Sequence, residues 1–222
     1  MNEPATLIIL AGGRSSRMGV PKHALHSDGR SVLELLHERL GERFVETLVI
    51  GARISGLPAG CRSLPDRDPR RGPLGGIATG LDAASTDLAL ILACDMPDVA
   101  PQLARLVLHE ARGVDVAIPV VHGYDEPLCA AYRKTCIPAA RRLMKEERLA
   151  VRGLYDLVTV RRIPEVALRC VDPDLESFVN LNTPRQIEVR QRRLAPAASG
   201  HTRCAEKMAA DIDATPPGSC TA

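Results

Sequence analysis

The stretch that decides the fold is the apolar run Thr6-Leu-Ile-Ile-Leu10, followed at once by Ala-Gly-Gly-Arg-Ser-Ser-Arg-Met-Gly-Val-Pro-Lys over residues 11–22. An unbroken apolar run of this length is typical of a strand buried on both faces. The paired glycines Gly12 and Gly13 then allow the backbone to turn sharply and to expose N–H groups, as a phosphate-binding loop requires. Together with Gly19 they have the wrong spacing for a P-loop and for a dinucleotide-binding loop. The segment therefore predicts a nucleotide-phosphate loop of another type, with an ordinary strand-to-helix loop as the alternative.

Three cationic side chains, Arg14, Arg17 and Lys22, occupy this loop, where they would lie beside a bound triphosphate. The net charge of the whole chain is only +2, so its composition does not indicate nucleic acid or an anionic membrane as a partner. With no Trp, 2 Phe and 3 Tyr, the chain also has few of the aromatic side chains on which RNA bases stack. The expected ligand is therefore a small anion held by local cations.

Length and composition favour one domain. A chain of 222 residues can bury a sizeable core, and its length suits a single α/β domain. From about residue 195 the sequence turns to Ala, Pro, Ser, Gly and Thr, which cannot offset the entropy of ordering the chain by burial. We therefore expect a folded domain over residues 1–194 and a disordered tail over residues 195–222.

The chain also carries signals about its cellular compartment. Its longest apolar runs, such as residues 88–93, are far shorter than the roughly 20 residues that cross a bilayer. The N-terminus shows no basic region followed by an apolar stretch. The 7 cysteines are scattered without any C-x-x-C pair, which indicates reduced thiols. We expect a cytoplasmic protein with no membrane partner.

Strand-like and helix-like patterns alternate along the first half of the chain. The expected strands are 6–10, 47–50, 88–93 and 115–120, and the expected helices are 31–43, 74–84 and 101–111, with a loop at 51–72. The second half is expected to hold a hairpin-like pair at 116–121 and 128–132, a helix at 136–148, weak strands at 157–171 and a last helix after Pro184. Helices that alternate with short apolar strands indicate an α/β fold, with a single doubly wound, mostly parallel sheet and helices on both faces.

An acidic residue follows the strand expected at 88–93, in Cys94-Asp95-Met96-Pro97. Ligands of open α/β sheets bind at the carboxyl ends of parallel strands, so Asp95 is expected beside the glycine loop. Mg²⁺ takes one or two carboxylates together with phosphate oxygens, which makes Asp95 the expected metal ligand if a nucleoside triphosphate binds here. The alternative is a helix-capping aspartate ahead of Pro97. Cys94 is expected to be a small buried residue rather than a nucleophile, because no histidine lies near it in the sequence.

Two further segments are candidates for ligand contacts. The loop at 66–77 is rich in glycine, opens a helix and carries Arg70 and Arg71, and helix N-termini attract anions. Its arginines could equally belong to a solvent-exposed loop with a Pro-Gly turn. In the segment 178–184, Asn180 and Asn182 share one face of an expected strand that precedes a helix capped by Thr183. Two amides facing one way suit a polar ligand, although an Asn pair in a turn is the commoner explanation.

Four motifs taken together resemble those of the molybdenum cofactor guanylyltransferases. They are L-A-G-G-x-S-x-R-M-G-x-x-K at 10–22, G-P-L-G-G-I at 72–77, C-D-M-P at 94–97 and F-V-N-L-N-T-P at 178–184. The resemblance spans roughly residues 5–193 and implies a Rossmann-like nucleotidyltransferase fold. In that family GMP is transferred from GTP to molybdopterin or to its molybdenum-loaded form, with Mg²⁺, and pyrophosphate is released.

The resemblance also implies roles for particular residues. Those implied to contact GTP are Leu10, Ala11, Gly12, Gly13, Lys22, Asp66 and Asp95. Asp95 would also hold Mg²⁺, Lys22 and Arg17 would stabilise the departing pyrophosphate, and Asn180 and Asn182 would belong to the molybdopterin side. The expected partners are GTP, molybdopterin, and the proteins that donate molybdopterin and accept the finished cofactor. One departure is Gly51, where some relatives have an Asn whose contact to the nucleotide would be lost or replaced here.

Two other readings stay open at this point. A molybdenum cofactor cytidylyltransferase or a sugar-phosphate nucleotidylyltransferase would share the sheet, the glycine loop and the aspartate, but relatives that use CTP usually read L-A-A-G where this chain has Leu10-Ala-Gly-Gly13. A non-catalytic nucleotide-binding module would share the fold. Simple binding would not require Arg17, Lys22 and Asp95 together, which argues against the module.

Overall fold

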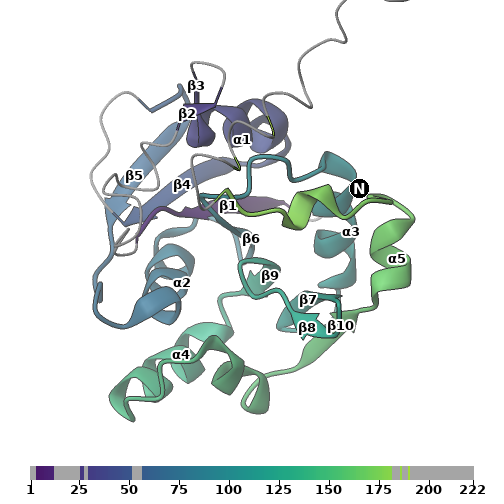
Figure 1. Cartoon of the computed structure of the whole chain (residues 1–222). Helices are drawn as coiled ribbons and strands as arrows, with labels where there is room; N and C mark the ends of the chain where they lie inside the picture. The colour runs from purple at the N-terminus through teal and green to yellow at the C-terminus, as the bar shows by residue number, and fades with distance from the viewer. Residues whose placement is uncertain are drawn as a thin grey trace, which may run out of the picture. The chain divides into compact units, whose positions relative to one another are not determined.

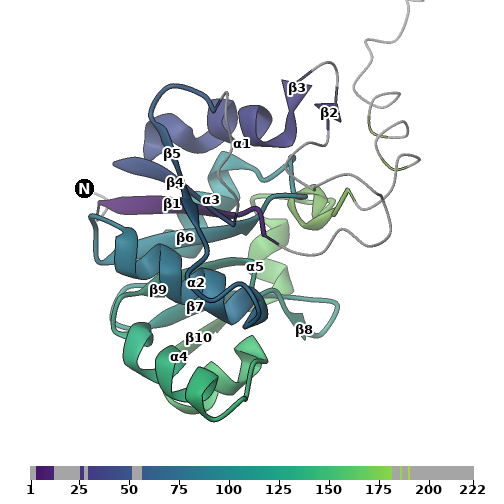
Figure 2. The same cartoon turned by 90° about the vertical axis from the view of Figure 1, so that its left-hand side faces the viewer.

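A mixed β-sheet is the central feature of the computed structural model (Figures 1 and 2). The structure describes residues 4–12, 26–27, 30–51 and 57–181, together with Gln186 and Arg190, which are helical. Within these ranges the strands of the sheet are β1 (Ala5–Leu10), β4 (Glu46–Gly51), β5 (Cys61–Pro65), β6 (Leu88–Ala93), β7 (Val116–Val121), β8 (Tyr124–Asp125), β9 (Cys129–Arg133) and β10 (Val160–Ile163). A separate pair is formed by β2 (His26–Ser27) and β3 (Arg30–Ser31).

The strands follow the order β10-β7-β9-β6-β1-β4-β5, with β8 paired to β7. β1 pairs parallel with both neighbours, so Leu10 stands beside Ile50 of β4 and Ala93 of β6. β5 and β10 are also parallel to their neighbours, β4 and β7. β9 runs antiparallel between β6 and β7. The expected mostly parallel sheet is therefore confirmed, with β9 running the other way inside it.

Helices cover both faces of this sheet, as expected (Figure 1). They are α1 (Val32–Leu40), α2 (Gly72–Ala83), α3 (Pro101–Glu110), α4 (Cys136–Lys145) and α5 (Glu165–Arg169), with 3-10 segments η2 (Gly41–Arg43), η3 (Val151–Asp156) and η4 (Glu176–Phe178). α2 and α4 lie on one face, and α1, α3 and α5 lie on the other. α1 begins at a capping box, in which the Glu34 N–H donates to Ser31 Oγ (3.2 Å) and the Ser31 N–H donates to Glu34 Oε2 (2.6 Å). No helix in the described part of the chain is long and apolar enough to cross a membrane.

The core between α2 and the sheet brings the helix close to β1. Leu74, Ile77 and Leu81 of α2 pack in one cluster with Ile8 and Ile50 of the strands, and all five are essentially inaccessible to solvent. Burying an aliphatic side chain of this size stabilises a protein by roughly 1.5–3 kcal/mol relative to leaving it exposed. This packing holds the start of α2 beside the carboxyl end of β1.

Outside the cavity, three segments differ from the expected secondary structure. β5 lies within the expected loop 51–72, because an edge strand with no fully buried residue lacks the apolar run that marks a central strand. The segment 157–171 holds β10 but then forms α5, a helix of 5 residues and too short to show helical periodicity. The helix expected to reach 148 ends at Lys145, because the Arg148 N–H donates back to the Leu143 carbonyl and Glu147 adopts a left-handed conformation (φ 58°).

The chain divides into two units, Met1–Pro184 and Arg185–Ala222. In the second unit the structure describes only Gln186 and Arg190. The cap expected from Thr183 lies outside the described residues, as does the boundary expected at residue 194. The division into a domain over 1–194 and a disordered tail therefore stays a prediction.

The contact between α2 and β1 can be tested at Gly80. A Cβ at this position would lie 2.7 Å from Ile8 Cγ2 and 3.0 Å from Ile8 Cδ1. Overpacking of this kind costs about 1–3 kcal/mol, and the better helix propensity of alanine returns at most about 1 kcal/mol. We therefore expect Gly80→Ala to lower the free energy of unfolding in urea. Gly153→Ala is the matched control, because its Cβ would lie 3.5 Å from Leu143 Cδ2, and equal stability of the two variants would contradict the packing argument.

Candidate active site

A cavity of about 530 Å³ lies at the edge where β6, β1, β4 and β5 end. β9 runs antiparallel, so it begins at this same edge. The cavity is lined by Leu10, Gly12, Ile50, Gly51, Asp66, Pro69, Gly72, Pro73, Gly76, Ala93, Cys94, Asp95, Met96, Glu126, Pro127, Leu128 and Asn180. Open α/β sheets bind their ligands at this edge. The structure thus brings together Leu10, Gly12, Asp66, Asp95 and Asn180 from the set predicted by sequence.

The floor of the cavity is backbone from the end of β1. Its pairing continues beyond the strand, because the Ala11 N–H donates to the Ile50 carbonyl (2.7 Å) and the Cys94 N–H donates to the Leu10 carbonyl (3.2 Å). Ala11 is buried, whereas Gly12 is exposed at the cavity. Gly12 therefore lines the cavity with backbone atoms alone, and these hydrogen bonds fix the residues that precede it.

Gly51 has no room for a side chain. Its φ is +145°, and a Cβ there would lie 2.4 Å from the Gly12 nitrogen and 2.7 Å from the Gly12 Cα. A Cβ on Gly12 would instead meet the Gly51 Cα at 3.4 Å. The departure noted at Gly51 therefore has a physical basis, because with this backbone an asparagine at position 51 would collide with the first loop.

Asp66 follows β5 and is held against α2. Its Oδ1 accepts the Asp68 N–H (2.9 Å) and the Thr79 hydroxyl (3.1 Å). The same Thr79 hydroxyl oxygen accepts the Arg67 N–H (3.2 Å). A Cβ on Gly76 would lie 3.2 Å from Leu10 Cδ2 and 3.8 Å from Asp66 Oδ2. The glycine in α2 thus allows the helix, the end of β1 and the carboxylate to meet at the cavity wall.

Asp95 lies at the middle of the site and is 5% exposed. Its carbonyl accepts the Leu181 N–H (2.8 Å), which holds the neighbouring Asn180 at the cavity. Cys94 is 1% exposed, as expected for a small core residue. The described residues contain no cluster of three or more side chains that could enclose a metal ion. A buried carboxylate that lines the cavity fits Mg²⁺, which is usually held by one or two carboxylates and phosphate oxygens.

The segment that carries Asn180 is not the expected strand. Residues 176–178 form η4, and residues 179–181 are irregular. The reason is a tight turn in which Asp172 accepts the N–H groups of Glu176 (3.1 Å) and Ser177 (2.9 Å) through its two carboxylate oxygens. The predicted shared face of Asn180 and Asn182 is therefore not confirmed, and Asn182 lies outside the described residues.

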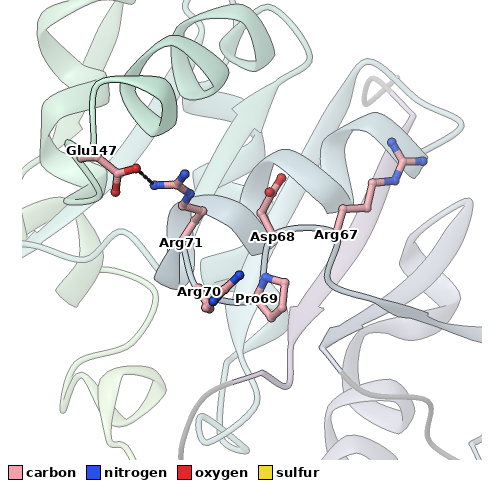
Figure 3. A pocket seen from close by; sticks show the side chains of 6 residues that line it. All are labelled: Arg67, Asp68, Pro69, Arg70, Arg71 and Glu147. Carbon is pink, nitrogen blue, oxygen red and sulfur yellow. Dashed lines mark ion pairs between the residues drawn. The ribbon is translucent and has the colours of Figure 1, made fainter.

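The arginines of the second glycine loop line a separate hollow of about 460 Å³ (Figure 3). Two of them are already engaged in ion pairs, Arg71 with Glu147 and Arg67 with Asp82. Figure 3 shows Arg71 turned toward Glu147, which follows α4, and Arg70 on the other side of the loop. These arginines do not line the main cavity, although Pro69 lines both hollows. The anion site expected from Arg70 and Arg71 stays a prediction.

The cationic part of the first loop lies outside the described residues. This concerns Gly13, Arg14, Arg17 and Lys22, whose expected roles stay predictions.

Sequence reasoning missed Glu126, which lines the cavity and is partly buried. Burial raises the pKa of the Glu126 carboxyl above its usual range, and His122 is the charged group that lowers it. The hairpin-like pair expected at 116–121 and 128–132 is confirmed by the antiparallel pairing of β7 and β9, and this direction is the signal that could have pointed to Glu126.

Comparison with known proteins agrees with this geometry. The model of the MobA-like NTP transferase domain matches residues 7–163. A probable molybdenum cofactor guanylyltransferase from Pelotomaculum thermopropionicum is 37% identical over 192 residues, which cover 86% of this chain and 93% of that protein. The crystal structure of molybdopterin-guanine dinucleotide biosynthesis protein A from Archaeoglobus fulgidus superposes with a TM-score of 0.74, at 24% identity, over 85% of this chain and 97% of that one.

A more distant structure shows how widely this fold is shared. The 2-C-methyl-D-erythritol 4-phosphate cytidylyltransferase from Thermus thermophilus superposes with a TM-score of 0.64, at 18% identity, over 87% of this chain and 98% of that one. Similarity of fold alone therefore does not distinguish guanylyltransferases from cytidylyltransferases. The family model and the sequence identity to guanylyltransferases are more specific, and from them we conclude that this chain is a nucleotidyltransferase that belongs to the MobA-like NTP transferase family.

Proposed function

We propose that the protein transfers GMP from GTP to molybdopterin or to its molybdenum-loaded form, in the presence of Mg²⁺, and releases pyrophosphate. The observation that carries this proposal is the cavity in which bare backbone at Gly12 and Gly51 meets the carboxylates of Asp66 and Asp95. Curated relatives with 37% and 34% identity are named as guanylyltransferases of this cofactor, which supports the choice of substrates.

The reaction needs positioning more than covalent chemistry. A phosphate oxygen of molybdopterin attacks the α-phosphorus of GTP, the bond to the β-phosphate oxygen breaks, and pyrophosphate leaves with the electron pair. The attacking phosphate is already ionised, so no general base is required. The protein must hold the two phosphates in line and offset the charge that develops on the leaving group.

Each residue then has one task. Gly12 and Gly51 let the nucleotide approach the backbone, and Asp66 contacts GTP from the wall near α2. Asp95 would hold Mg²⁺, which when bound supplies positive charge to the phosphate oxygens. Lys22 and Arg17 stabilise the departing pyrophosphate, and Asn180 serves the molybdopterin side.

The setting and the competing activities complete the proposal. The described cysteines are free thiols, in line with a protein of the reducing cytoplasm. Other proteins would donate molybdopterin to the enzyme and accept its product. Pyrophosphate release with Mg²⁺, GTP and molybdopterin tests the activity directly. Release with GTP would exclude the non-catalytic module, and equal rates with CTP would favour a cytidylyltransferase.

Asp95→Asn tests the metal position. The change keeps the volume of the side chain and removes its charge, so we expect GMP transfer to fall by about a hundredfold with the fold intact. Asp87→Asn is a matched control, because Asp87 precedes the same strand at its other end, where it pairs with Arg133 (2.8 Å) at the surface. Steady-state rates and circular dichroism of both variants provide the measurement, and wild-type turnover of Asp95→Asn would refute the assignment.

Lys22→Ala tests the charge of the first loop. We expect transfer to slow at least tenfold, which corresponds to about 1.4 kcal/mol of lost transition-state stabilisation. Lys145→Ala, at the exposed end of α4, serves as the control for loss of a cation. If the KM for GTP rose and kcat stayed unchanged, Lys22 would bind substrate and transition state equally.

The choice of base is tested at Gly12. We expect the wild-type protein to use GTP about ten- to a hundredfold better than CTP, because donors and acceptors left unpaired in a buried site cost roughly 1–3 kcal/mol each. Gly12→Ala should narrow this gap by lowering kcat/KM for GTP. A methyl group there approaches only the Gly51 Cα among the described atoms, so Gly12→Ala should keep its thermal stability, whereas Gly51→Ala should lose it. Equal rates with both nucleotides in the wild type would overturn the assignment.

A further inference from the structure

The segments that line the cavity follow the order of the strands in the sheet, and Asp95, after β6, lies between the segment before β9 and the segments after β1, β4 and β5. β6, which leads into Asp95, is flanked by β9 on one side and by β1, β4 and β5 on the other. Because neighbouring strands are about 4.8 Å apart, the end of β5 is about 14 Å from that of β6, and the start of β9 is about 5 Å away on the opposite side. The residues proposed for GTP, Gly12, Gly51 and Asp66, all belong to the β1-β4-β5 side.

In-line transfer places the attacking oxygen of the acceptor opposite the leaving pyrophosphate, while guanosine is a lateral substituent of the same phosphorus. The loop after β1 is proposed to stabilise the pyrophosphate, and Gly51 and Asp66, proposed for GTP, lie at the ends of β4 and β5. The acceptor is therefore expected on the side of β9. Glu126, Pro127 and Leu128 line the cavity on that side. This part of the argument rests on the proposed function.

The segment that carries Glu126 is fixed by backbone contacts. The Glu126 N–H donates to the Pro119 carbonyl (2.9 Å), and the Leu128 carbonyl accepts the Ala93 N–H (2.9 Å). Between them, the Pro127 carbonyl accepts the hydroxyl of the fully buried Tyr132 (2.9 Å). The carboxylate is therefore presented at the cavity from a rigid support.

The carboxylate itself takes no part in the hydrogen bonding of the fold within the described residues. No side chain or backbone group in this part of the chain donates a hydrogen bond to it, and the charged group that acts on it, His122, is paired with Glu165 (3.6 Å). Partial burial raises the pKa of the Glu126 carboxyl, although His122 lowers it. Because the carboxylate lines the cavity and no protein group among the described residues donates to it, its oxygens are available to accept hydrogen bonds from a ligand.

The chemistry of a carboxylate selects the kind of donor. Its two oxygens accept two parallel N–H groups best, as they do from a guanidinium. The aminopyrimidinone edge of a pterin offers such a pair, one ring N–H and the adjacent amino group, and guanine offers the same pair. We propose that Glu126 binds the aminopyrimidinone edge of the pterin and thereby selects the acceptor substrate.

The surroundings of Glu126 suit a flat ring. A second hollow of about 340 Å³ shares Pro73 and Pro127 with the main cavity. Its walls include Leu149, Val151 and the ring of Tyr155. A pterin held at Glu126 thus has apolar surface beside it.

Glu126→Gln tests the proposal by binding, without turnover. The amide keeps the size of the side chain but replaces one acceptor with a donor, so the dissociation constant for 6-hydroxymethylpterin should rise at least about tenfold. The dissociation constant for GTP with Mg²⁺ should change less than about twofold. Glu126→Asp keeps both acceptors and should bind the pterin with intermediate affinity. Glu42→Gln, at an exposed position of η2, is the matched control and should behave as the wild type.

Each other outcome overturns the proposal. A loss of GTP affinity with unchanged pterin affinity would assign Glu126 to guanine, and weaker Mn²⁺ binding in the presence of GTP would assign it to the metal. Absence of pterin binding by the wild type, or equal binding by all variants, would leave Glu126 without this role. The proposed function fails separately: if the wild type binds pterin through Glu126 but never forms pyrophosphate from GTP and molybdopterin, only the activity is refuted.

Discussion

The site depends on one close approach, between the backbones at the ends of β1 and β4. The hydrogen bond from the Ala11 N–H to the Ile50 carbonyl (2.7 Å) carries the pairing one residue past β1, and there Gly12 and Gly51 meet without room for a Cβ at position 51. A side chain at that point would push the two strand ends apart. Since the Leu10 carbonyl also accepts the Cys94 N–H (3.2 Å), the place of Asp95 depends on the same strand end. Backbone, rather than side chains, therefore sets the position of the carboxylate relative to the nucleotide side.

The antiparallel strand β9 supplies the part of the cavity that the ends of the parallel strands do not. Parallel strands bring only their carboxyl ends to the edge, which supplies the segments after β1, β4, β5 and β6. β9 brings its beginning instead, and with it residues 126–128. A reaction between two large substrates needs contacts on both sides of the reacting phosphates, and a parallel strand at this position would have brought the residues that follow it to the edge in place of residues 126–128. The inserted strand thus supplies the segment on which we propose that the acceptor binds next to Asp95.

Sequence patterns predicted the elements that are both long and buried. β1, β4 and β6 are continuous apolar runs, and the rule that ligands bind at their carboxyl ends placed Asp95 correctly at the cavity. The pattern failed where burial is partial or the element is short. β5 at the edge alternates too weakly, α5 has fewer than two turns, and η4 owes its shape to Asp172, which accepts two N–H groups several residues away. In each case a regular hydrophobic period is missing.

The two most informative residues missed or undervalued by sequence, Gly51 and Glu126, share one physical reason. Gly51 was noted only as a departure from relatives, yet its glycine is required by the neighbouring Gly12, which is 39 positions away in the chain but in contact in space. Glu126 looks like a loop residue until the direction of β9 is known, because the same residue before a parallel strand would lie at the opposite edge. The hairpin-like pair expected at 116–121 and 128–132 indicated that β9 runs antiparallel to β7, but the pairing of β9 with β6, which brings Glu126 to this edge, joins segments about 40 residues apart. A carboxylate can therefore belong to the cavity through topology alone, and for this reason the acceptor side of the site was harder to predict than the nucleotide side, where a glycine-rich loop marks the position in the sequence itself.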